Sequence, residues 1–253
     1  MEILNYLSTR PYIAYLVNIL SLFMAKPHNC HCKTTKRVIR YLKGNVDFGI
    51  EYSNHLNIEL IGYSDSDWER DPNDKKSTIG YAFSIGSIIV SWRSKKQPTV
   101  SLSSTKVEYK ALCSSTYEAI WLRHIFEDSG ERKGVPTSIK CDNQISIKLT
   151  NNPNYHARSK HIENQHHFVR EKIQSKEIDL IYSNTHDNVV DIFTKPLGKT
   201  KYVISEKDFY KWMVTSRLIQ FNPICYLVVT CCYYKRIQKR SSLLLMYKKL
   251  VEI

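Results

Sequence analysis

Apolar and polar residues follow two different periods along this chain, and the period changes from segment to segment. Short apolar-rich runs with β-branched and aromatic residues, which are typical of strands, occupy residues 47–53, 58–68, 77–86, 87–94, 138–142 and 177–183. Apolar residues spaced three or four positions apart, which is the spacing of one helix face, occupy residues 12–24, 34–44, 103–129, 143–152, 159–174 and 188–196. Three strands are thus followed by helix–strand alternation, an order that predicts an α/β domain with helices on both faces of a mixed sheet.

Turn and cap residues set the expected limits of these elements. Gly86 and Ser87 separate two strands, as a tight hairpin requires. The helix within "TTKRVIRYLKG" is expected to start at a threonine cap, Thr34 or Thr35, and to stop at Gly44. The long helix over residues 103–129 is expected to end at Gly130.

The charge of the chain favours a polyanionic partner. The 253 residues include 37 Lys and Arg against 24 Asp and Glu, a formal net charge of +13, and the pI is about 9.3. An excess of this size favours nucleic acid first and an anionic membrane second. Residues 199–253 carry 11 basic and 3 acidic residues, so much of the excess lies in this C-terminal stretch.

Cysteine usage and hydropathy indicate where the protein works. The seven cysteines are an odd number without a pairing pattern, and the N-terminus lacks a signal peptide pattern. The two most apolar stretches, residues 12–25 and 221–234, have 14 residues each, whereas a membrane span needs about 20. We therefore expect an intracellular protein, cytoplasmic or nuclear, with no secretion, no transmembrane span and no membrane partner.

Four carboxylates occupy positions where a site would form. Asp65 ends the first strand of the 58–198 region, and Glu108 lies in the first turns of the long helix; Asp142 ends the next strand, and Asp191 lies in the last short helix. Acids that converge at strand ends of an α/β sheet would make an oxygen cage for Mg²⁺. The alternative, four separate solvated strand and helix ends, stays open because spacing alone does not show convergence.

Longer motifs carry a resemblance to a known family. Residues 58–198 contain, in order, "YSDSDW", "KSTIGYAF", "VSWRSKKQPTVSLSSTKVEYKAL", "EAIWLR", "KCDNQISIKL", "RSKHIENQHHFVREK" and "DIFTKPLG". This series resembles the ribonuclease H region of the Pol polyprotein of Ty1/copia-type LTR retrotransposons. Residues 10–53 resemble the C-terminal end of the reverse transcriptase of the same polyprotein. The chain is therefore expected to have three parts: a helical reverse transcriptase remnant that ends in a strand (1–55), a ribonuclease H-like domain (56–198), and an unmatched basic and apolar tail that is poorly ordered (199–253).

The resemblance implies a fold, a reaction and a ligand set. The fold is ribonuclease H-like, with a five-stranded mixed sheet flanked by helices. The reaction is hydrolysis of the RNA strand of RNA–DNA hybrids with two Mg²⁺ or Mn²⁺ ions and no small-molecule cofactor. The family's four acidic ligands fall on Asp65, Glu108, Asp142 and Asp191, and the first Asp of the "SDSD" element, Asp65 rather than Asp67, is the ligand.

The resemblance also proposes roles outside the four acids. His186, in the loop before the last helix, matches a loop histidine that is thought to assist proton transfer or product release in cellular ribonucleases H. The alternative, a surface loop histidine without such a role, stays open. The expected partners are an RNA–DNA hybrid and, as a further candidate, the polymerase part of the polyprotein. Contacts to the hybrid are expected from five basic or histidine side chains and one amide, with solvated surface positions as the alternative: Arg93, Lys95, Lys96, Asn143, Lys160 and His161.

The sequence departs from the family pattern at two places near the acids. Lys106 stands where the family usually has Glu, and "DWERD" replaces the usual "DWAGD". The first change puts a cation two residues before Glu108, and the second puts bulkier side chains close to Asp65 in the sequence. An inactive, truncated remnant that only binds nucleic acid, or has no function, is therefore the alternative to an active nuclease.

Overall fold

The computed structural model describes residues 10–45, 59–68, 74–86, 88–101, 103–130, 134–151, 163–185 and 188–197. These segments contain five strands: β1 (Leu60–Asp67), β2 (Thr78–Ile85), β3 (Ile88–Lys96), β4 (Thr137–Cys141) and β5 (Ile178–Tyr182). The helices among them are η1 (Pro11–Ile13), α2 (Ala14–Leu22), α3 (Asn29–Gly44), α4 (Ser104–Asp128), α5 (Gln144–Asn151), α6 (Glu163–Gln174) and α7 (Asp191–Thr194). Each of these strands and helices falls within or beside a segment that the hydrophobic pattern predicted.

The five strands form one mixed sheet in the order β3-β2-β1-β4-β5. Neighbours β1 and β2 are antiparallel, as are β2 and β3, whereas β1 with β4 and β4 with β5 are parallel. The first three strands are thus a meander, and the parallel pairs are reached through helices α4 and α6, as parallel strands require. The predicted α/β class, with a five-stranded mixed sheet flanked by helices, is confirmed.

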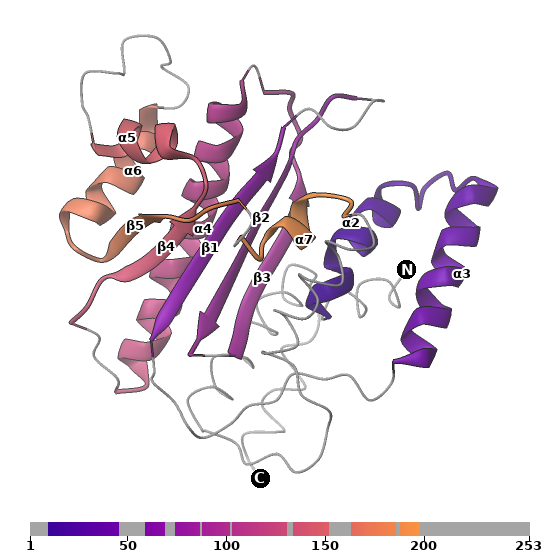
Figure 1. Cartoon of the computed structure of the whole chain (residues 1–253), viewed down its shortest axis with the longest axis horizontal. Coiled ribbons are helices and arrows are strands. Elements are labelled where there is room, and N and C mark those ends of the chain that lie inside the picture. The colour runs from indigo at the N-terminus through magenta and orange to yellow at the C-terminus, as the bar shows by residue number, and fades with distance from the viewer. Residues whose placement is uncertain are drawn as a thin grey trace.

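Both faces of the sheet are covered. In Figure 1, the long helix α4 lies behind the sheet, and α7 lies in front of it beside α2. The α4 face holds one apolar cluster, to which β2 contributes Phe83 and α4 contributes Leu122. The opposite face holds a second cluster, in which Val17 of α2 packs with Ala82 of β2 and Phe193 of α7. Because β2 faces both clusters, all eight of its residues are buried.

The second cluster joins the N-terminal helices to the rest of the fold. It contains η1 and α2 residues together with Val38 of α3, and it also contains residues of β3 and α7. Residues 11–22 therefore share a core with the sheet, although they precede the predicted ribonuclease H-like region. The division of the chain into three parts stays a prediction, because residues 1–9, 46–58 and 198–253 lie outside the described segments, as does the strand predicted over 47–53.

The predicted threonine cap of α3 was wrong. The helix begins at Asn29, after His28 in an extended conformation. The Oγ1 atoms of Thr34 and Thr35 instead donate to the carbonyls of Cys30 and His31, four residues earlier, at 2.9 Å each. The helix starts earlier because the His31 Nδ1 accepts a hydrogen bond from the His28 N–H at 3.1 Å, and the His31 ring stacks on Phe23.

No helix in the described part of the chain has the length and apolar character needed to cross a lipid bilayer. The predicted intracellular location stays a prediction.

Candidate metal centre

Three of the four predicted acids meet at one edge of the sheet. Strands β1 and β4 run parallel, and Ser64 is paired with Cys141, so Asp65 and Asp142 follow at neighbouring carboxyl ends. Helix α4 packs against β1 and presents Glu108 from its second turn. One carboxylate oxygen from each of these three residues lies within 4.8 Å of the others.

Burial makes this group of carboxylates electrostatically strained. Asp65 has no exposed surface, and burial raises its pKa to about 7. The Lys195 charge opposes this rise, whereas the charges of Asp191 and Asp142 add to it. Burial also raises the pKa of Glu108 well above its usual range, and the charges of Asp65 and Asp142 add to that effect. The neighbouring carboxylates therefore add to the disfavoured ionisation of Asp65 and Glu108, and a divalent cation among them would reverse the effect.

These residues fit a divalent cation. Mg²⁺ and Mn²⁺ bind carboxylate oxygens, and the three acids offer such oxygens from three different elements. Among the residues that the structure describes, the group contains carboxylates and neither histidine nor cysteine, and this donor set matches a hard oxygen-binding ion rather than zinc.

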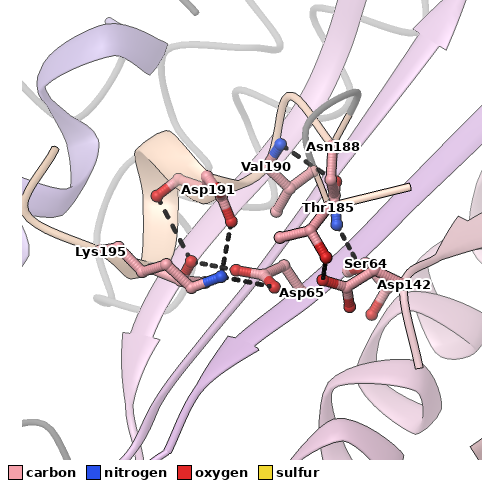
Figure 2. A network of polar contacts seen from close by, with 9 residues as sticks. Ser64, Asp65, Asp142, Thr185, Asn188, Val190, Asp191 and Lys195 are labelled. Carbon is pink, nitrogen blue, oxygen red and sulfur yellow. Dashed lines mark hydrogen bonds and ion pairs between the residues drawn. The ribbon is translucent and has the colours of Figure 1, made fainter. Parts of the chain in front are cut away.

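The fourth predicted acid, Asp191, is linked to Asp65 through a lysine. Lys195 Nζ lies 2.6 Å from Asp191 Oδ1 and 3.2 Å from Asp65 Oδ1 (Figure 2). The Thr194 hydroxyl donates to the other carboxylate oxygen of Asp65. Burial opposes the charged form of Lys195, but the two carboxylates outweigh it and raise the pKa of the lysine.

Close packing and a buried amide hold α7 in this position. The Asn188 side chain donates from Nδ2 to the Ser64 carbonyl at 3.3 Å and accepts from the Val190 N–H at 3.3 Å. The loop before α7 is thus tied to β1 one residue before Asp65 (Figure 2). Beneath the helix, Gly80 of β2 leaves no room for a side chain.

Asp142 has a partner of its own. The Thr185 hydroxyl donates to Asp142 Oδ2 at 2.9 Å from the segment that follows β5 (Figure 2). Sequence reasoning missed Thr185, Asn188, Thr194 and Lys195. A signal for Lys195 was present, because it lies four residues after Asp191, which is the spacing of an ion pair on one helix face.

The predicted nucleic-acid contacts are only partly described. Arg93, Lys95 and Lys96 lie on the C-terminal half of β3, an edge strand, and Lys96 is ion-paired with Asp74 at 2.9 Å. Asn143 directly follows Asp142, and its Oδ1 accepts from the Ser146 N–H at 2.9 Å at the start of α5. Three further predicted residues lie outside the described segments: Lys160, His161 and His186.

Comparisons with known proteins add relatives by sequence. No protein-family model matches the chain. Over 200 residues, which are 79% of this chain, it is 40% identical to the retrovirus-related Pol polyprotein from transposon RE1 of Arabidopsis thaliana. It is 33% identical over 199 residues to the corresponding polyprotein from transposon TNT 1-94 of Nicotiana tabacum. The chain spans only 14% and 15% of the lengths of these two polyproteins.

The similarity of the chain to solved structures is weaker than its similarity to these polyproteins. The structure of the ribonuclease H1 named LC11, solved in complex with an RNA/DNA hybrid, is similar over 54% of this chain and 94% of that chain. The sequence identity is 11% and the TM-score is 0.40, so the fold assignment depends on the strand order and directions described above.

Proposed function

This chain belongs to the Pol polyprotein family of copia-type retrotransposons, as a fragment, and on this premise we propose that it hydrolyses the RNA strand of RNA–DNA hybrids with divalent metal ions. The observation that carries the proposal is the convergence of Asp65, Glu108 and Asp142, with oxygens within 4.8 Å of one another. Three buried or half-buried acids this close together disfavour the ionised form of Asp65 and Glu108, and a divalent cation would relieve that cost, which supports a metal-binding role over three separate structural roles.

In the proposed reaction, Asp65, Glu108 and Asp142 would hold one divalent ion, and Asp65 with Asp191 would hold the second. Bound ions of this kind activate water and stabilise the charge that develops on the phosphate and the leaving oxygen. Asp65 is common to both positions, so the hydrogen bond from Thr194 orients the most important ligand. Thr185 orients Asp142 in the same way.

Substrate binding is proposed to use positively charged side chains, which contact the phosphate backbone of the hybrid, and one amide side chain near the acids. Arg93 and Lys95 on the edge strand are candidates for the backbone contacts. Asn143, one residue beyond Asp142, is the candidate for a hydrogen bond to a 2′-hydroxyl, which distinguishes RNA from DNA. His186 is proposed to assist proton transfer or product release.

The test uses the full 253-residue chain and a hybrid labelled on its RNA strand. We expect the RNA to be cut in Mg²⁺ or Mn²⁺, duplex DNA of the same sequence to stay intact, and EDTA to stop the reaction. The Asp142→Asn variant should lose more activity than the roughly 10–100-fold that loss of an outer-shell partner costs. The matched control is Asp179→Asn, because Asp179 is exposed on β5.

The opposite outcome is equally clear. A folded chain that binds the hybrid in a salt-sensitive way, but cuts nothing across Mg²⁺ and Mn²⁺ titrations, would be a nucleic-acid-binding remnant. Activity that survives in Asp142→Asn would place the chemistry elsewhere.

A further inference from the structure

The position of the Lys195 ammonium group has a consequence for metal loading. Its nitrogen lies between Asp65 and Asp191, 3.2 Å and 2.6 Å from their oxygens, and both of these residues have no exposed surface. Asp65 also belongs to the three-carboxylate group with Glu108 and Asp142. One carboxylate is therefore shared between a place for a divalent ion and a place that a lysine already fills.

We propose that Lys195 is a built-in cation of the site, which holds the position between Asp65 and Asp191 in the metal-free protein and must leave before a divalent ion enters there. The inference depends on the function proposed above in one respect, namely that a divalent ion binds this group of acids. It adds an order of loading: the first ion binds Asp65, Glu108 and Asp142, and the second displaces Lys195.

Geometry excludes joint occupancy. Mg²⁺ lies about 2.0–2.1 Å from its oxygen ligands. An ion bound to both Asp65 Oδ1 and Asp191 Oδ1 would thus occupy the space that the lysine nitrogen now fills at hydrogen-bonding distance from the same two atoms. Repulsion between the ammonium and a divalent ion at this separation adds to the steric conflict.

The Lys195 side chain can also turn away from the two carboxylates toward solvent. Lys195 follows the last residue of α7, and its side chain is 18% exposed, so one side of it borders solvent. A lysine carries its charge on a flexible four-carbon stem, which can turn outward without movement of the backbone. The two carboxylates lack this freedom, because both residues are fully buried and Thr194 donates a hydrogen bond to Asp65.

Charge balance favours this exchange over a purely structural ion pair. Lys195 contributes a single positive charge to a site with four carboxylates: Asp65, Glu108, Asp142 and Asp191. With Lys195 in place, burial still raises the pKa of both Asp65 and Glu108, so their ionised forms are not fully stabilised by the lysine. Replacement of one monovalent cation by a divalent one brings the charge closer to balance.

The first experiment measures Mn²⁺ binding to the EDTA-treated full chain by isothermal titration calorimetry. In Lys195→Met, which keeps the apolar stem and removes the charge, we expect the second ion to bind at least tenfold more tightly than in the wild type. The matched control is Lys172→Met, because Lys172 is also ion-paired, at 3.0 Å from Glu177, with a side chain 20% exposed, on a different helix. Its binding should equal that of the wild type. If the second ion binds Lys195→Met within twofold of the wild-type affinity, the proposal is wrong.

The second experiment needs no variant, so it stands even if Lys195→Met does not fold. Acetylation of the wild-type lysines is followed by mass spectrometry as Mn²⁺ is added. We expect acetylation of Lys195 to rise at least fivefold as the second ion binds, while that of Lys172 stays constant. Two bound ions with Lys195 still protected would overturn the proposal. A wild-type chain that binds no Mn²⁺ would refute this inference and the proposed function together, whereas normal binding without displacement would refute this inference alone.

Discussion

Replacement of Gly80 by alanine should disturb the metal centre through a contact that does not involve any of its ligands. Gly80 is paired with Asp65 in the β1–β2 register and lies directly beneath α7. An added Cβ would lie 2.8 Å from Thr194 Cγ2 and 2.9 Å from Phe193 Cβ. Non-bonded carbon atoms prefer about 3.5–4.0 Å, so α7 would have to retreat by roughly 0.7–1.2 Å to relieve the closest contact.

The size of the effect follows from that displacement. Overpacking of a well-packed interior costs about 1–3 kcal/mol of unfolding free energy. The shift also moves Thr194, the donor to Asp65, and a misplacement of about 1 Å in a catalytic site can reduce the rate by about 100-fold. We therefore expect Gly80→Ala to lose more hybrid-cleavage activity than its loss of stability explains.

Denaturant unfolding in EDTA measures the stability, and cleavage is measured at a temperature at which the variant is fully folded. Gly134→Ala is the control, because a Cβ there meets no atom within 4 Å. Adding Thr194→Ser to Gly80→Ala should restore part of both losses, since it removes the clashing methyl group and keeps the hydroxyl. The reasoning is refuted if Gly80→Ala unfolds within about 0.5 kcal/mol of the wild type and cuts at the wild-type rate.

Two further outcomes are expected. In EDTA, burial raises the pKa of Asp65 from 3.8 to about 7 in the folded state, so between these pH values the folded chain keeps a proton that the unfolded chain has lost. The unfolding free energy of the wild type should therefore fall as the pH rises from 3.8 to about 7, and it should fall less in Asp65→Asn. A rise in the wild type would contradict this expectation. Val17→Ala should lower the unfolding free energy, measured with denaturant, by about 1–3 kcal/mol, because Val17 is 3% exposed and packs in the cluster shared with α7. Leu16→Ala, at a position 39% exposed, should lower it by less than about 0.5 kcal/mol. Equal small effects would mean that α2 does not share the core of the sheet.

Local pattern was a good guide to the elements of this fold. The long helix predicted over residues 103–129 is α4, and the hairpin at Gly86 joins β2 to β3. Periodicity and turn residues are properties of neighbouring positions, so they can be read without the rest of the chain. The start of α3 was missed because the stacking of His31 on Phe23 extends the helix beyond its threonines.

The identity of the acids was also within reach of the sequence, but their arrangement was not. Motif resemblance pointed to Asp65, Glu108, Asp142 and Asp191, and three of them do come together. The fourth is paired instead with Lys195, which also contacts Asp65. No sequence spacing predicts the contact between Lys195 and Asp65, because these residues are 130 positions apart.

The sequence by itself determined which segments become helices and strands, which family the motifs resemble and which carboxylates are candidates. Only the tertiary structure decided that β1 and β4 run parallel, so that Asp65 and Asp142 reach the same edge of the sheet. It alone decided that α7 packs on Gly80 and brings a lysine into the acidic site. The physical reason is that short-range periodicity reflects local burial, whereas the distance between two charges depends on how distant elements pack.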